Sequence, residues 1–94
     1  YSIIIIHFME INKLIKIIKE KITKEIVLQE INIEDKSFLH KNHKSNEKGK
    51  FHLKISIESK ELNKIGKLES NRIIHKIMNE EIKLYIHSLQ ILIH

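Results

Sequence analysis

Three histidines are the residues of this chain whose type and spacing could bind a metal. His87 interrupts a strand-like apolar run at Ile86–Leu89, and His40 and His43 form a His-x-x-His pair in a polar segment. Imidazole nitrogen is a ligand suited to iron, zinc and copper. The 94-residue chain has no cysteine, so it cannot by itself build a thiolate zinc or iron–sulfur site. Any metal it holds must therefore rest on histidine or carboxylate ligands.

Each of these histidines also has an ordinary structural interpretation. His87 alternates with Leu89 and Ile91 on one face of its predicted strand, where a histidine is commonly a partly buried core residue. His40 and His43 lie in a lysine-rich segment and, taken alone, are expected to be exposed to solvent. The residues alone leave both interpretations open.

Hydrophobic spacing predicts the elements that position these histidines. The order is α-β-β-α-α-β, and the elements cover about residues 9–25, 31–34, 51–58, 59–66, 68–82 and 85–93. They predict an α+β fold, a three-stranded mixed sheet with helices packed on one face and the last two strands parallel. The last strand is apolar on both faces and is predicted to be central. His52 is expected on the polar face of the second strand, as a structural or surface residue.

Length and charge limit the alternatives. Residues 9–94 are expected to form a single domain, and Tyr1–Phe8, before the first methionine, a disordered or added tail. No apolar run reaches the roughly 20 residues of a membrane span. The segment from Lys36 to Lys54 holds six lysines and one glutamate, which accounts for the whole net charge of +5. This segment is either a solvated connection or a surface that steers an acidic partner or a phosphate backbone.

The order of these parts resembles the BolA-like family. The family's motifs match, in chain order, Asp35, Ser37, His40 and His43, then residues 49–53, Ile77–Ile82 and Ile86–Leu89. From His52 to the end the match needs no gap. The family's Arg-His-Arg signature falls on Ser70, Asn71 and Arg72, so only its last arginine is retained.

The resemblance implies a class II KH-like fold and a non-enzymatic adaptor that pairs with a monothiol glutaredoxin. The two proteins would share a [2Fe–2S] cluster for cluster transfer or iron regulation, with one thiolate from glutaredoxin and one from glutathione. This chain would supply His87 and, by position, His40, with His43 as the reserve ligand. The isolated protein would carry no cofactor. The helix with Ser70, Asn71 and Arg72 and the C-terminal strand would form the docking face, while mitochondrion and cytosol both stay open as the compartment.

The alternative function is nucleic-acid binding, because KH-like folds bind nucleic acid and the chain is basic. The candidate contacts are Lys60, Lys64, Lys67, Arg72 and Lys76. The two glycines, Gly49 and Gly66, are too far apart for the Gly-x-x-Gly loop of KH domains, so only weak, salt-sensitive binding is expected. The chain also lacks a Gly-rich phosphate loop and a cysteine nucleophile, and no enzymatic turnover is expected.

Overall fold

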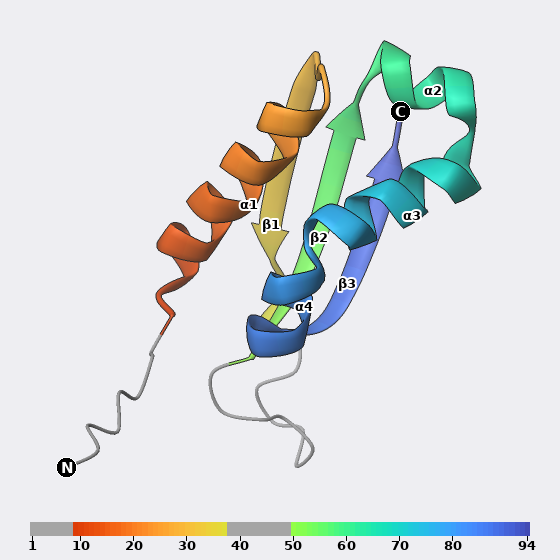
Figure 1. Ribbon diagram of the computed structural model, residues 1–94. Helices are drawn as coiled ribbons and strands as arrows, with labels where there is room; N and C mark the ends of the chain where they lie inside the picture. The colour runs from red at the N-terminus through yellow and green to blue at the C-terminus, as the bar shows by residue number, and fades with distance from the viewer. Residues whose placement is uncertain (1–8, 38–49) are drawn as a thin grey trace, which may run out of the picture.

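The computed structural model describes residues 9–37 and 50–94. The elements in these ranges are, in chain order, α1 (Ile11–Glu25), β1 (Glu30–Asp35), β2 (Phe51–Glu58), α2 (Lys60–Ile65), α3 (Lys67–Ile77), α4 (Asn79–Tyr85) and β3 (Ile86–Ile93). The strands form one sheet, and the helices lie on one side of it (Figure 1). The predicted α+β fold, with helices on one face of a three-stranded mixed sheet, is confirmed. The predicted tail at residues 1–8 lies outside the described residues and stays a prediction.

Strand β2 lies at the centre of the sheet, with β1 antiparallel on one side and β3 parallel on the other. The parallel pairing of the last two strands is therefore confirmed. The prediction that the histidine-bearing strand is central is wrong, because β3 is an edge strand among the described residues. Apolar residues on both faces of a strand indicate that the strand is buried, but they do not show how many strands are hydrogen-bonded to it. In this sheet β2 is hydrogen-bonded to both β1 and β3, so β2 is the central strand.

One apolar core joins the helices to the covered face of the sheet. Helix α1 contributes Leu14, Ile18 and Ile22 at helical spacing, and β2 contributes Ile55 and Ile57, all 0% exposed. Burial of each such side chain stabilises the fold by about 1.5–3 kcal/mol. Successive side chains of a strand point to opposite faces of the sheet. Because Ile55 and Ile57 point into the core, the residues of β2 that alternate with them lie on the opposite, polar face.

The helix predicted over residues 68–82 is divided into two. Helix α3 ends at Ile77, and the fully buried Met78 (φ −95°, ψ 10°) separates it from α4, which continues to Tyr85. Tyr85 is therefore helical, and β3 begins one residue later than predicted. As a result α4 runs directly into the strand that carries His87.

The junction between α2 and α3 follows the signals in the sequence. Ser59 caps α2, because its Oγ accepts a hydrogen bond from the Leu62 N–H at 3.1 Å, and it donates to the Val27 carbonyl at 2.9 Å. Gly66, at φ 87°, ends α2 and lets α3 begin at the next residue. These bounds agree with the helix predicted over about residues 59–66.

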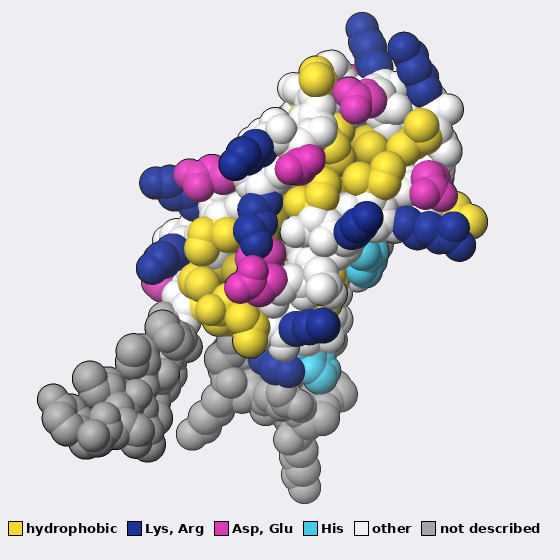
Figure 2. All heavy atoms as spheres, viewed as in Figure 1, with side chains coloured by type: hydrophobic (Ala, Val, Ile, Leu, Met, Phe, Trp, Pro, Cys, Tyr) yellow, Lys and Arg dark blue, Asp and Glu magenta, His cyan; other side chains and the backbone are white. Residues whose placement is uncertain are grey.

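Apolar side chains also gather on the outer surface of the helical layer (Figure 2). A groove of about 810 Å³ lies where α1, α2 and α3 meet, and its apolar lining consists of Ile26, Leu62, Ile65, Ile73 and Ile77. Lysines from α1 and α3 stand at the same groove. None of the helices in the described ranges is long and apolar enough to cross a membrane.

Candidate metal centre

His87 lies at a β-bulge at the beginning of β3. Its neighbours Ile86 and Ser88 pair with consecutive residues of β2, so His87 itself has no partner there. Simple alternation, counted back from Leu89 on the core side, would turn His87 toward the core. The extra residue of the bulge breaks this alternation, so that Ile86 is buried and His87 is exposed. The interpretation of His87 as a partly buried core residue is therefore wrong.

The bulge brings His87 next to a second histidine, His52 of β2. The centroids of the two rings are 5.0 Å apart, and the ring planes are inclined by 62°. His52 is only 6% exposed, and its Nδ1 lies 2.6 Å from Oγ of Ser88. Two imidazoles from adjacent strands thus meet at one end of the sheet.

Hydrogen bonds attach this end of β2 to the end of β1. The backbone N–H of His52 donates to Oγ of Ser37 at 3.1 Å, and the His52 carbonyl accepts from the Lys36 N–H at 2.7 Å. Ser37 is itself held by a backbone hydrogen bond to Oδ1 of Asp35 at 2.9 Å. The Asp-x-Ser pattern of the sequence therefore has a structural function, because it fixes the backbone beside His52.

A small hollow beside His52 is positively charged. It measures about 340 Å³, and its lining includes Lys36, His52, Lys54 and Ser88. Nζ of Lys36 lies 3.8 Å from Oε2 of Glu34, and this half-buried ion pair offsets part of the charge. A cationic surrounding favours a metal group of net negative charge over a bare metal cation.

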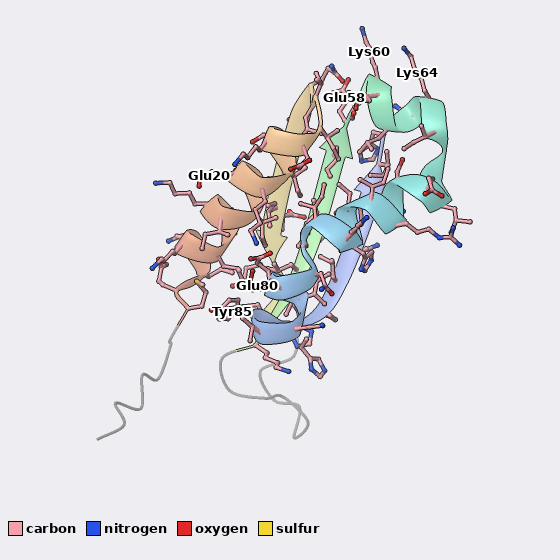
Figure 3. All side chains as sticks on the ribbon, viewed as in Figure 1. Glu20, Glu58, Lys60, Lys64, Glu80 and Tyr85 are labelled. Carbon is pink, nitrogen blue, oxygen red and sulfur yellow. The ribbon has the colours of Figure 1, made fainter. Side chains whose placement is uncertain are left out.

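An ion pair holds α4, and with it the start of β3, against α1. Nζ of Lys21 donates to Oε2 of Glu81 at 2.6 Å and lies 3.6 Å from Oε2 of Glu80. The Glu81 side chain is 6% exposed, whereas that of Glu80, labelled on α4 in Figure 3, is 73% exposed. The hydrogen bond to Glu81 raises the pKa of Lys21 above its usual 10.5, against the opposing effect of burial, and so stabilises the charged ammonium.

The family comparison matches most of the described fold. Residues 22–94 match the family model described as BolA-like protein. The chain belongs to the BolA-like family. The resemblance inferred from the motifs is therefore confirmed.

Two solved structures from Arabidopsis thaliana are similar to this BolA-like domain. The BolA domain of SufE1 is 27% identical, with a TM-score of 0.69, and the match covers 83% of this chain and 86% of that one. BolA1 is 25% identical, with a TM-score of 0.70 and coverage of 85% and 88%. A search of curated proteins finds no match. The structural likeness supports the assignment of the fold.

The loop histidines of this BolA-like domain cannot be placed. His40 and His43 lie outside the described residues, so their assignment as metal ligands stays a prediction. Their segment joins the described chain at Ser37, whose hydroxyl accepts the hydrogen bond from His52. Of the three predicted ligands, the structure describes only His87.

The three residues of the predicted docking set have different environments on α3. Ser70 is 0% exposed, and its hydroxyl donates to the carbonyls of Leu62 and Gly66 at 2.8 and 2.6 Å. Asn71 is half-buried and donates to the Lys67 carbonyl, while the Arg72 side chain is 68% exposed. Ser70 thus ties α3 to α2, and in this conformation only Asn71 and Arg72 present side-chain surface to a partner.

The basic residues of the alternative function are all exposed. They lie on α2 and α3 and comprise Lys60, Lys64, Lys67, Arg72 and Lys76. Lys60 and Lys64 project away from the sheet (Figure 3), and Arg72 lies 3.6 Å from Glu69. Figure 2 shows acidic side chains interspersed among the basic ones on the helical face. The basic residues therefore do not form a continuous stripe there.

Sequence reasoning missed that His52 of β2 lies beside His87 and Ser88 of β3. The family motif matched at residues 49–53 includes position 52, yet alternation alone assigned His52 a structural or surface role. The missing signal was the parallel register, which pairs His52 with Ser88. In the described part of the chain, no group of three or more histidine, aspartate or glutamate side chains is placed to hold a metal ion.

Proposed function

We propose that this BolA-like protein is a non-enzymatic adaptor that pairs with a monothiol glutaredoxin. In the pair, His87 binds one iron of a shared [2Fe–2S] cluster, and His40 or His43 is the second histidine of this chain. Glutaredoxin and glutathione each supply a thiolate, and the pair serves cluster transfer or iron regulation.

The observation that carries this proposal is the exposed position of His87 on the bulge. The bulge turns the His87 side chain away from the core and leaves it exposed, so it is available to a molecule outside the domain. A histidine kept on the core face could not reach a cluster held by another protein.

The donor set of this chain fits one half of a mixed-ligand cluster. The chain has no cysteine, so every thiolate must come from another molecule. Imidazole ligands on one iron remove negative charge and raise the potential of the cluster, as they do in Rieske centres. With neutral imidazoles, two thiolates balance the charge of the oxidised [2Fe–2S] core, and reduction of the cluster makes the group anionic, which suits the surroundings made by Lys36 and Lys54.

The docking face in this proposal consists of the exposed part of α3 and the strand β3. Arg72 and Asn71 offer hydrogen-bond donors on α3. Strand β3 is an edge strand among the described residues, and its His87 end follows α4 directly. A partner seated against these elements would approach the bulge from the exposed side.

The test is anaerobic reconstitution followed by visible absorption and circular dichroism. The purified protein is mixed with a monothiol glutaredoxin, glutathione, ferrous iron and sulfide, and the spectrum is compared with that of glutaredoxin alone. We expect a new spectrum at one-to-one stoichiometry that is absent for His87→Ala. The matched control is His75→Ala, because His75 is an exposed histidine on α3.

Two results would contradict the proposal. An unchanged spectrum with the wild-type protein would show that the two proteins do not share a cluster. A wild-type spectrum with folded His87→Ala would leave the cluster without the ligand that we assign. An amide NMR spectrum of His87→Ala tests whether the variant is folded.

Nucleic-acid binding is the second candidate, favoured by the exposure of all five basic residues on α2 and α3. The acidic side chains among them weaken this candidate, since phosphate binding depends on net positive charge. Titration with DNA at several salt concentrations tests it. If the logarithm of the affinity does not change with the logarithm of the salt concentration, phosphate neutralisation is excluded. A steep negative slope that becomes shallower in Lys60→Ala and Lys64→Ala would support nucleic-acid binding.

A further inference from the structure

We infer that two copies of this chain form a homodimer through the groove of about 810 Å³ where α1, α2 and α3 meet. In this dimer the groove of each copy faces the groove of the other. Neither His87 nor the docking residues Asn71 and Arg72 line the groove, so the dimer interface is separate from the surface used in the proposed function.

The floor of the groove is aliphatic. Ile26 and Leu62 are buried beneath it, Ile73 and Ile77 are half-buried, and Ile65 is 45% exposed. Figure 2 shows apolar side chains gathered on this outer face of the helical layer. Removal of such a surface from water is favourable in proportion to the apolar area that becomes buried. The floor therefore suits contact with another apolar surface.

The rim of the groove carries charges of both signs. Lys24 and Lys76 are its exposed cations, and Glu25 and Glu61 are its exposed anions. Among the described residues, none of these four side chains takes part in an ion pair, whereas Lys21 is engaged in its ion pair with α4. A ligand of one charge sign would meet unfavourable as well as favourable charges at this rim.

A second copy of the chain offers a matching set of charges. In a dimer with two-fold symmetry both subunits use the same patch, so the patch must be complementary to itself. Two lysines and two glutamates meet this condition, because the lysines of each copy can face the glutamates of the other. A rim of one sign would instead repel its own copy.

The net charge of the chain does not arise at the groove. The surplus of five positive charges lies in the segment Lys36–Lys54, and the charges of the remaining residues balance to zero. The described residues of that segment do not line the groove, which is formed by helices alone. Two grooves can therefore approach each other without strong local repulsion.

The first experiment measures sedimentation velocity and amide NMR spectra of the full chain from micromolar to millimolar concentration. We expect a shift from monomer to dimer, with concentration-dependent amide shifts at the residues that line the groove. A monomer at every concentration would overturn the inference and leave the groove to a partner of different sequence. A dimer whose amide shifts lie at the edge of β3 would also overturn it.

The decisive test reverses the charges of the rim in two different ways. Lys24→Glu/Lys76→Glu removes its cations, and Glu25→Lys/Glu61→Lys removes its anions. We expect each double variant alone to dimerise at least about tenfold more weakly than the wild type, because like charges then face each other. An equal mixture of the two should associate at least as strongly as the wild type. A mixture that does not associate, or wild-type affinity in either variant alone, would refute the proposed pairing.

The matched control for the acidic variant is Lys13→Glu/Lys16→Glu. These two lysines of α1 are exposed and do not line the groove, and their reversal changes the net charge of the chain by the same amount. The control should dimerise like the wild type. Equal weakening in the control and in Lys24→Glu/Lys76→Glu would show that net charge, and not the rim, governs association.

The apolar floor is tested with Ile65→Asp. A carboxylate at this position would lose water on dimerisation, so we expect at least about tenfold weaker association. Leu84→Asp is the control, because Leu84 is 54% exposed on α4 and does not line the groove. Equal effects of the two substitutions in folded variants would contradict the interface. These measurements need no metal and no glutaredoxin, so their outcome is independent of cluster reconstitution.

Discussion

Replacement of Lys21 by methionine tests how α4, and with it the start of β3, is held against the rest of the domain. Methionine keeps most of the aliphatic length of lysine but removes the ammonium group. The side chain of Glu81 is 6% exposed, and its Oε1 has no hydrogen-bond partner in the described structure. Without Lys21, Oε2 would lose its cation, and neither oxygen of this buried carboxylate would have a partner in the described structure, which is strongly unfavourable.

The expected loss of unfolding free energy is about 1–3 kcal/mol. Breaking a fully buried pair costs about 3–5 kcal/mol, but the Lys21 side chain is 37% exposed, so water can partly replace it. Urea unfolding at neutral pH measures the difference. The control is Lys19→Met, an exposed lysine of the same helix, for which we expect a change within about 0.5 kcal/mol. The double variant Lys21→Met/Glu81→Leu should recover much of the loss, because no buried charge remains.

The pH dependence gives a second readout of the same pair. The pKa of Lys21 is raised in the folded chain, so its contribution to stability is complete below the usual value of 10.5 and is lost as the pH rises through the folded-state pKa. The stability difference between wild type and Lys21→Met should therefore narrow above pH 10.5. Equal stabilities of Lys19→Met and Lys21→Met at neutral pH would refute the role of the pair.

Three further predictions concern single positions. His87→Ala should change the unfolding free energy by no more than about 0.5 kcal/mol, since the side chain is exposed, and circular dichroism during urea unfolding would detect a larger loss. Ser70→Ala should lower the unfolding free energy by about 1–3 kcal/mol, because the Leu62 carbonyl loses the buried hydroxyl donor, while the Gly66 carbonyl keeps the backbone N–H of residue 70. The hydrogen bond of Asn71 is exposed, so Asn71→Ala is the milder control by thermal unfolding. Ile55→Ala should cost about 2–5 kcal/mol in urea unfolding, against less than about 0.5 kcal/mol for Leu68→Ala at a side chain that is 71% exposed.

Much of the fold could be predicted because its elements carry strong periodic signals. Leu14, Ile18 and Ile22 recur at helical spacing, and Leu53, Ile55 and Ile57 alternate with polar residues. These patterns record which side of an element is buried, so they predict both the element and its orientation. The motif order then predicted the family from residues on several elements.

Features that depend on contacts between distant elements could not be predicted in this way. The central position of β2 results from its pairing with both β1 and β3. The break in the helix at Met78 depends on how α3 and α4 pack on the sheet. The bulge at His87 arises from the parallel register of β3 against β2, which no local pattern in β3 encodes. Counting alternate residues therefore assigned His87 to the wrong face, although it identified the strand correctly.

The register also explains why the two histidines should respond differently to substitution. His87 lies outside the ladder and is exposed, so its removal leaves the hydrogen bonds of the sheet intact. His52 is inside the ladder and buried, and its ring is in contact with Ser88, so its replacement should lower the stability of the fold. Comparison of His52→Ala and His87→Ala by urea unfolding at one temperature therefore tests whether the register of β3 gives the two histidines different structural functions.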